Sequence, residues 1–378
     1  MLVSRLSCNR LSHSRRDTPP DLVSFQHMKI TYTIQPTKSA SAESLILVPD
    51  QTESLARVVI EGIAPAVREM LPCFTAYLDR YPTDRWLLFS DYVLNNDDRY
   101  HDVYAFTMMP GGNYWNAIAD ECHANSRFDF KRVRTISPAM LSLLQDERFF
   151  TICIAVKKPG ILTRDRVLLR QIVDRSALAM EQDRTTGAKA ERLLKMKYLQ
   201  REIRKKQFNV KLLNYSILAS TFAGYLTYLV ASYWRATRIG WFSDRDALID
   251  ANDAIAHSFY STAVAANCYH GCSGWSGPVL GSNPAPALEG TPWSDPFTRI
   301  PDYFAGTVAG WDFDQNWLLV GDKYLVMLRD VIAESTRAHV ISLHLQASDT
   351  ALQGLSRLVR STRVHTLGQT RSKDSIGE

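Results

Sequence analysis

The chain has none of the short motifs that identify common enzyme classes. No phosphate-binding glycine-rich loop, no nucleophile elbow and no zinc-protease helix occurs in its 378 residues. The sequence therefore gives no support to a P-loop nucleotide hydrolase, an α/β-hydrolase or a zinc metalloprotease. No internal repeat is present, which argues against a solenoid. No secretory signal is visible, so we expect a reducing compartment and a cytoplasmic location.

Cysteine is scarce, with six residues scattered over the chain. Four of them stand apart from one another and are typical of buried free thiols. Cys268 and Cys272 instead enclose His270, and two thiols with an imidazole this close together can ligate zinc. A structural zinc site needs a second ligand pair, which the sequence does not offer, so we predict no zinc site here.

The remaining composition is that of a globular protein. Apolar residues make up 46% of the chain and the formal net charge is +5. The length suits one large domain or two smaller ones, and a core can be built at this size. The sequence pI of about 8.8 permits an acidic partner such as nucleic acid without requiring one.

The domain organisation is predicted from shifts in composition. Residues 1–27 are rich in arginine and serine, and we expect a disordered leader or a wrongly assigned start, since Met28 opens a more structured stretch. Residues 28–340 are predicted to form a single α/β domain, with its core at about 85–311. Residues 341–378 are expected to form a C-terminal helix followed by a flexible tail.

Two strands follow a predicted helix at 52–81, whose pattern Pro65 interrupts. Residues 85–94 are apolar enough for a central strand, 102–109 return as its partner, and turn residues lie between them. Asp91 lies in the middle of the first strand. A buried aspartate there is costly unless it is paired or bound to metal. If Asp91 points to solvent, its position carries no functional meaning.

A long helical insertion is predicted at about 163–236, and part of it is strongly basic. Residues 188–211 contain nine lysines and arginines against two glutamates. One interpretation is an electrostatic footprint for phosphates, and the other is a solvated helix face. The candidate nucleic-acid-binding residues are Lys197, Arg201, Arg204, Lys205 and Lys206.

Residues 212–234 contain no charged side chain and are long enough to span a bilayer. Serines, threonines and a glycine lower the hydrophobicity of this stretch. We therefore predict a helix buried inside a large soluble domain. A membrane anchor remains the alternative.

The clearest chemical signal is the stretch from Arg238 to Asp246. Apolar residues lead into Asp244 and Asp246, and a helical pattern follows at 247–266. Residues two apart on a strand point to the same side, so both carboxylates can face one point at the strand's tip. Two such charges are costly together unless a cation lies between them.

A fourth aspartate, Asp302, precedes small residues that let a helix approach another backbone closely. It is expected at the N-terminus of that helix, where a carboxylate is a routine cap and is also well placed to bind metal.

These features resemble a family of bacterial ribonuclease H-like proteins. Its members begin the first strand with Asp-Glu-Ser-Gly and end the core with Ala-Asp-(Leu/Phe)-(Val/Ile)-Ala-Gly. Residues 300–306, Ile-Pro-Asp-Tyr-Phe-Ala-Gly, are similar to the second motif. Ser90-Asp91-Tyr92 occupies the place of the first, without its Glu, Ser and Gly. The resemblance implies a ribonuclease H-like α/β fold with a mixed sheet, and it implies that Asp91 and Asp302 are metal ligands.

Three functions follow as expectations. The first is a Mg²⁺- or Mn²⁺-dependent nuclease of mobile-element or phage-defence type. Its predicted catalytic residues are Asp91, Asp244, Asp246 and Asp302, and its predicted metal ligands are Asp91, Asp244 and Asp302. The second is a non-catalytic relative that binds nucleic acid or protein. The third is a membrane-anchored protein that uses residues 212–234.

Overall fold

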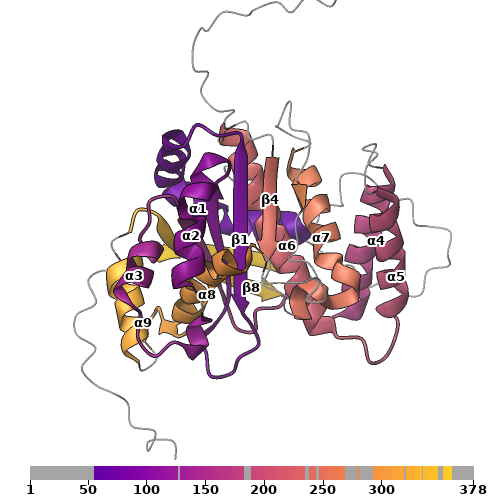
Figure 1. Ribbon diagram of the computed structural model, residues 1–378. Helices are drawn as coiled ribbons and strands as arrows, with labels where there is room; N and C mark the ends of the chain where they lie inside the picture. The colour runs from indigo at the N-terminus through magenta and orange to yellow at the C-terminus, as the bar shows by residue number, and fades with distance from the viewer. Residues whose placement is uncertain are drawn as a thin grey trace, which may run out of the picture. The chain divides into compact units, whose positions relative to one another are not determined.

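The computed structural model describes residues 55–359, apart from 127, 183–188, 235–237, 244–246, 269–278, 281–292, 319–320, 334 and 348–351. All of the described residues belong to one compact unit within Thr31–Glu378. A mixed β-sheet with helices on both faces forms this unit (Figure 1).

The sheet has seven strands in the order β5-β4-β1-β2-β3-β8-β9. Their bounds are β1 Arg85–Val93, β2 His101–Pro110, β3 Phe150–Lys157, β4 Arg238–Ser243, β5 Val279–Leu280, β8 Ala338–Ala347 and β9 Leu352–Val359. β1, β2 and β3 form an antiparallel meander, as the sequence predicted for its first two strands. β4 joins the other side of β1 in parallel, and β5 continues parallel to β4. β8 runs parallel to β3, and β9 is antiparallel to β8.

The helices were mostly predicted from apolar periodicity. They are α1 Leu55–Arg80, α2 Asn113–Asn125, α3 Pro138–Leu144, α4 Arg166–Gln182, α5 Lys189–Glu202, α6 Val210–Trp234, α7 Ala247–Cys268, α8 Asp295–Ala309 and α9 Asp322–Val326. A 3₁₀ turn, η3, covers Phe130–Arg132, and a π-helical turn, η4, covers Met327–Ile332 after α9. A small separate hairpin pairs β6 Trp311–Asp312 with β7 Trp317–Leu318. Ser137 starts α3 as expected, because its hydroxyl accepts a hydrogen bond from the Met140 amide.

Alternating residues of β1 face two separate apolar clusters. Trp86 and Leu88 are buried in the cluster that contains α1, α6 and α7. Leu87 and Phe89 pack in the second cluster, with α8 and with residues of α2 and α3. The sheet is therefore covered on both faces, and α8 crosses β1, β2 and β3 on the second face.

The uncharged helix α6 is buried, as predicted. Two of its serines bond to the backbone of α7: Ser216 Oγ donates to the Leu248 carbonyl at 2.9 Å, and Ser220 Oγ donates to the Ala256 carbonyl at 2.8 Å. These bonds account for polar residues in a helix that lies inside the protein. Among the described residues, no helix combines the length and apolarity needed to cross a membrane.

Two expectations about the elements were wrong. α1 continues through Pro65 and also through Pro72, with both proline side chains exposed. Its core-facing residues, such as Ile63 and Phe74, are fully buried, and this packing outweighs the lost backbone bonds. The predicted C-terminal helix is replaced by β8 and β9 up to Val359, because β8 pairs along β3 and its β-branched Val340 and Ile341 are buried.

Candidate functional site

Asp91 lies near the end of β1, on the sheet face covered by α8. It shares this face with Phe89, which stacks on Phe297 of α8 with 5.1 Å between ring centroids. The Asp91 carboxylate is partly exposed, and its Oδ1 accepts a hydrogen bond from the Tyr92 amide at 2.6 Å. It is therefore neither a fully buried charge nor a freely solvated one.

Hydrogen bonds on the opposite face fix the ends of β1 and β4 side by side. Ser90 pairs with Ser243 in the parallel register. Trp241 Nε1 donates to Ser90 Oγ at 2.8 Å, and Ser243 Oγ donates to the Tyr92 hydroxyl at 3.1 Å. The residue after Ser90 is Asp91, and the residue after Ser243 is Asp244. The register therefore sets Asp91, near the end of β1, beside the end of β4, which Asp244 follows in the sequence.

Asp302 is not at a helix start, which corrects the prediction. α8 begins at Asp295, where Pro296 occupies the first turn, and Asp302 lies seven residues further on. Its Oδ2 accepts a hydrogen bond from the Phe130 amide at 2.5 Å, so it holds the turn η3 against α8. Burial, together with the nearby Asp302 charge, raises the pKa of Tyr303 to about 12.

Lysine and arginine side chains reinforce this junction between η3 and α8. Lys323 Nζ donates to the Phe130 carbonyl at 2.6 Å and lies 4.3 Å from the centroid of the Phe130 ring. On α8, Arg299 Nη1 donates to the Ser126 carbonyl at 2.9 Å, and Arg299 Nε lies 3.9 Å from Oδ1 of Asp129, the residue before η3. At least one oxygen of Asp302 therefore has a structural role in a fixed polar junction.

The remaining predicted catalytic aspartates, Asp244 and Asp246, lie outside the described residues, as do His270 and Cys272. In the part of the chain that the structure describes, no three histidines, cysteines or carboxylates come together as a metal-binding group. Asp91 and Asp302 alone do not make such a group.

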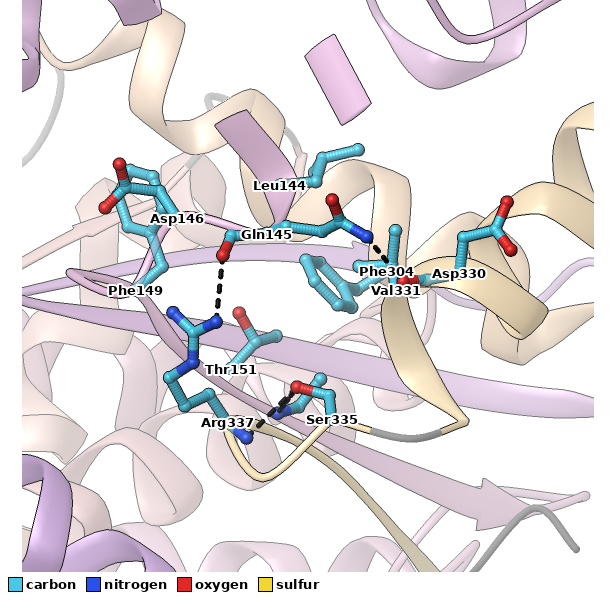
Figure 2. A pocket seen from close by; sticks show the side chains of 11 residues that line it. Leu144, Gln145, Asp146, Phe149, Thr151, Phe304, Asp330, Val331, Ser335 and Arg337 are labelled. Carbon is cyan, nitrogen blue, oxygen red and sulfur yellow. Dashed lines mark hydrogen bonds between the residues drawn. The ribbon is translucent and has the colours of Figure 1, made fainter. Parts of the chain in front are cut away.

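A pocket of about 190 Å³ lies elsewhere, where α3, η4 and the start of β8 meet (Figure 2). Asp146 and Asp330 line it, but Arg148 bonds the first at 2.6 Å and Arg329 bonds the second at 2.7 Å. Arg337 Nη2 donates to the Gln145 carbonyl across the pocket at 2.9 Å. Both carboxylates that line the pocket are therefore bonded to arginines. Neither Asp91 nor Asp302 lines this pocket.

The predicted basic residues lie on α5 and on the turn that follows it. α4 and α5 pack side by side next to α7, at one side of the sheet (Figure 1). Lys197 approaches Glu181 at 3.7 Å, and Lys205 pairs with Glu202 at 2.6 Å. The Arg166 guanidinium, at the start of α4, donates to the Lys205 and Lys206 carbonyls at 2.9 and 2.7 Å. These bonds attach the turn after α5 to α4 and satisfy two of its backbone carbonyls.

Asp102 is a buried carboxylate that sequence reasoning missed. It lies on β2 with 2% of its surface exposed. It accepts hydrogen bonds from the Asn95 amide at 2.7 Å, the Gly160 amide at 3.2 Å and the Tyr215 hydroxyl at 3.3 Å. It was the first residue of the strand predicted at 102–109, whereas β2 already begins at His101 and buries Asp102.

Comparison with protein-family models, with curated proteins and with solved structures finds no match to this chain.

Proposed function

We propose that this protein is a metal-dependent nuclease with a ribonuclease H-like sheet. The support is topological: β1, β2 and β3 form an antiparallel meander, and later strands add in parallel on the free side of β1. Ribonuclease H-like sheets have this arrangement, and they gather carboxylates at the end of the first strand. Asp91 occupies that place.

The pairing of Ser90 with Ser243 is the observation that carries the proposal. It sets Asp91 beside the strand end that leads into Asp244. Two carboxylates brought together in this way provide the oxygen ligands that Mg²⁺ prefers. Bound Mg²⁺ ions would stabilise the attacking and leaving oxygens of phosphodiester hydrolysis.

The described residues fit this role unequally. Asp91 fits it because its carboxylate is partly exposed at the end of a fixed strand. Asp302 fits less well, because its Oδ2 holds the Phe130 amide. We therefore assign Asp91 as a metal ligand, with Asp244 as its expected partner. Asp302 would act as a ligand only through Oδ1, because Oδ2 accepts the Phe130 amide.

The test is calorimetric titration of Mn²⁺ into the full chain and into Asp91→Asn, Asp244→Asn and Asp302→Asn. The exposed Asp120→Asn on α2 is the matched control. We expect saturable binding that is lost in the first two variants and kept in the control. Cleavage of labelled DNA and RNA should then require Mn²⁺ or Mg²⁺ and should fail in the same two variants. Equal Mn²⁺ binding by all four variants would refute the metal site.

A non-catalytic nucleic-acid-binding protein is the second candidate. It is favoured by the structural role of Asp302 and by the basic α4–α5 pair. If this candidate is correct, the protein binds oligonucleotides in the absence of metal. It does not cleave them when metal is present. The same titration and cleavage assays separate it from the nuclease.

A further inference from the structure

The positive charge of the chain is concentrated in one segment. Residues 163–211, which include α4 and α5, contain fourteen lysines and arginines against six aspartates and glutamates, a net charge of +8. The whole chain carries +5, so the remainder sums to −3. A surface of this kind attracts polyanions over a distance of about a Debye length, roughly 8–10 Å at moderate salt.

The same segment exposes apolar side chains that its fold does not bury. Leu194 has 66% of its surface exposed and Tyr198 has 40%, although both lie on a helix with a well-packed inner face. That inner face includes Met196 and Leu199, and Ile203 continues it just after the helix; each is at most 1% exposed. The packed inner face therefore holds α5 in place, while Leu194 and Tyr198 on its outer face remain exposed to solvent.

Leu194, Tyr198 and Arg201 form one row along α5, because residues three and four apart lie on the same side of a helix. The Arg201 guanidinium lies 6.0 Å from the centroid of the Tyr198 ring. Lys197 on α5, which lies 3.7 Å from Glu181, and Arg204 just after α5 are also exposed. An aromatic ring beside an arginine, with further cations on the same segment, matches a stacked base and its neighbouring phosphates.

We propose that this row on α5 is a stacking surface for unpaired bases, and that the protein binds single-stranded nucleic acid in preference to duplex. The inference rests on nucleic acid being the partner, as in the proposed function, and adds the class of substrate. A duplex presents phosphates to the basic side chains but hides its base faces inside the stack. A single strand offers both, so it gains the contact with Tyr198 that a duplex lacks.

The test is fluorescence anisotropy of the full chain with a labelled 20-nucleotide single strand and with the matching duplex. Tyr198→Ala should weaken single-strand binding by roughly 5- to 150-fold, the range for loss of one stacked base, and should leave duplex binding nearly unchanged. Tyr198→Phe should retain the affinity, because it keeps the ring. Tyr100→Ala is the matched control, since Tyr100 is 42% exposed and lies outside α4 and α5.

Three outcomes would overturn the inference. The first is equal affinity for single strand and duplex, and the second is an equal effect of Tyr198→Ala and Tyr100→Ala. The third is co-sedimentation with vesicles of anionic phospholipid, lost in Leu194→Ala and Tyr198→Ala, together with no single-strand preference. That result would assign the row to a membrane surface.

Failure of the proposed nuclease would look different. Single-strand binding that depends on Tyr198, with no metal binding and no cleavage, would support this surface and reject the catalysis. Metal-dependent cleavage with no effect of Tyr198→Ala would do the reverse.

Discussion

Asp102 ties three segments of the chain to one carboxylate. Its oxygens accept bonds from the amides of Asn95 and Gly160 and from the hydroxyl of Tyr215. A Cβ added to Gly160 would lie 2.6 Å from Asp102 Oδ2, so a residue larger than glycine does not fit at this position. A buried carboxylate that accepts several hydrogen bonds stabilises the fold, and removing its charge leaves donors without acceptors.

We therefore expect Asp102→Asn to lower the free energy of unfolding by about 1–3 kcal/mol. Asparagine keeps the size of the side chain but turns an NH₂ group toward an amide N–H. Urea denaturation monitored by circular dichroism measures the change. Asp120→Asn, on the exposed side of α2, is the control and should alter stability by less than about 0.5 kcal/mol. Similar effects of the two substitutions would show that the Asp102 hydrogen bonds contribute little.

A second residue makes stability depend on pH. Burial would raise the pKa of Asp146, but hydrogen bonds from the Arg148 side chain and amide outweigh burial and hold it below its usual range. The stabilisation is therefore complete above the unfolded-state pKa, near 3.9, and is lost as the pH falls through the lower folded-state value.

Asp146→Asn should accordingly flatten the loss of stability in acid. The free energy of unfolding, measured in urea at pH 6 and at pH 3, should fall less in this variant than in the unmodified chain. Asp120→Asn should follow the unmodified chain. An identical decline in Asp146→Asn would mean that the pKa of Asp146 is not lowered.

Residue-level prediction from sequence succeeded where chemistry is local and failed where partners are distant. Asp91 was placed on a central strand because the apolar run around it is continuous. Asp302 was expected at a helix start ahead of a run of small residues, whereas the helix begins earlier, at Asp295-Pro296. Asp102 was missed because its three donors come from Asn95, Gly160 and Tyr215, which only the folded chain assembles.

At the scale of elements, the close approach of α6 and α7 depends on a missing side chain. A Cβ at Gly224 would lie 2.8 Å from Ala263 Cβ and 3.3 Å from the Val264 amide nitrogen. Neither neighbour is the end of a flexible side chain, so the helices would have to separate. Overpacking of this kind costs about 1–3 kcal/mol, against a gain of about 1 kcal/mol in helix propensity.

We expect Gly224→Ala to destabilise the protein and Ala263→Gly to relieve part of that effect. Thermal unfolding of both single variants and the double variant forms a double-mutant cycle. The double variant should be more stable than the sum of the two single effects predicts. Strict additivity would show that the helices do not touch at this point.

Elements were predicted well wherever one periodicity dominated. The first strands, the long buried helix α6 and the strand that ends at Ser243 all follow from apolar runs. β8 was missed, because its pairing with β3 and β9 is not encoded in its own alternation. The insertion was recognised as helical, and its basic part at 188–211 was distinguished from the uncharged helix at 212–234, whereas the packing of α4 and α5 beside α7 could not be predicted.

At the scale of the whole molecule, charge separation predicts how binding responds to salt. Affinity for a single strand should fall linearly with the logarithm of salt concentration, with a slope of about −0.7 for each phosphate that is neutralised. Substituting Arg201, Arg204 and Lys206 by glutamine should reduce the magnitude of that slope by about two. Anisotropy titrations over a series of salt concentrations provide the measurement.

The matched control removes the same charge from other exposed positions, as Arg68, Arg134 and Lys157 to glutamine. It should leave the slope nearly unchanged. Equal slopes for the two triple variants would show that attraction depends on the net charge and not on where the charge lies.

Because β4 pairs with β1, the sheet stays incomplete during synthesis until β4 has been made. β3 ends at Lys157 and β4 begins at Arg238, so the meander leaves the ribosome 80 residues before the strand that completes its other side. At translation rates of roughly 5–20 residues per second, this delay lasts about 4–16 s. During this delay, one edge of β1 is unpaired. In the same interval α6 emerges, and α7 has not yet been made to cover that helix. The nascent chain therefore presents its apolar helix α6 before α7, which packs along it most extensively, has been synthesised.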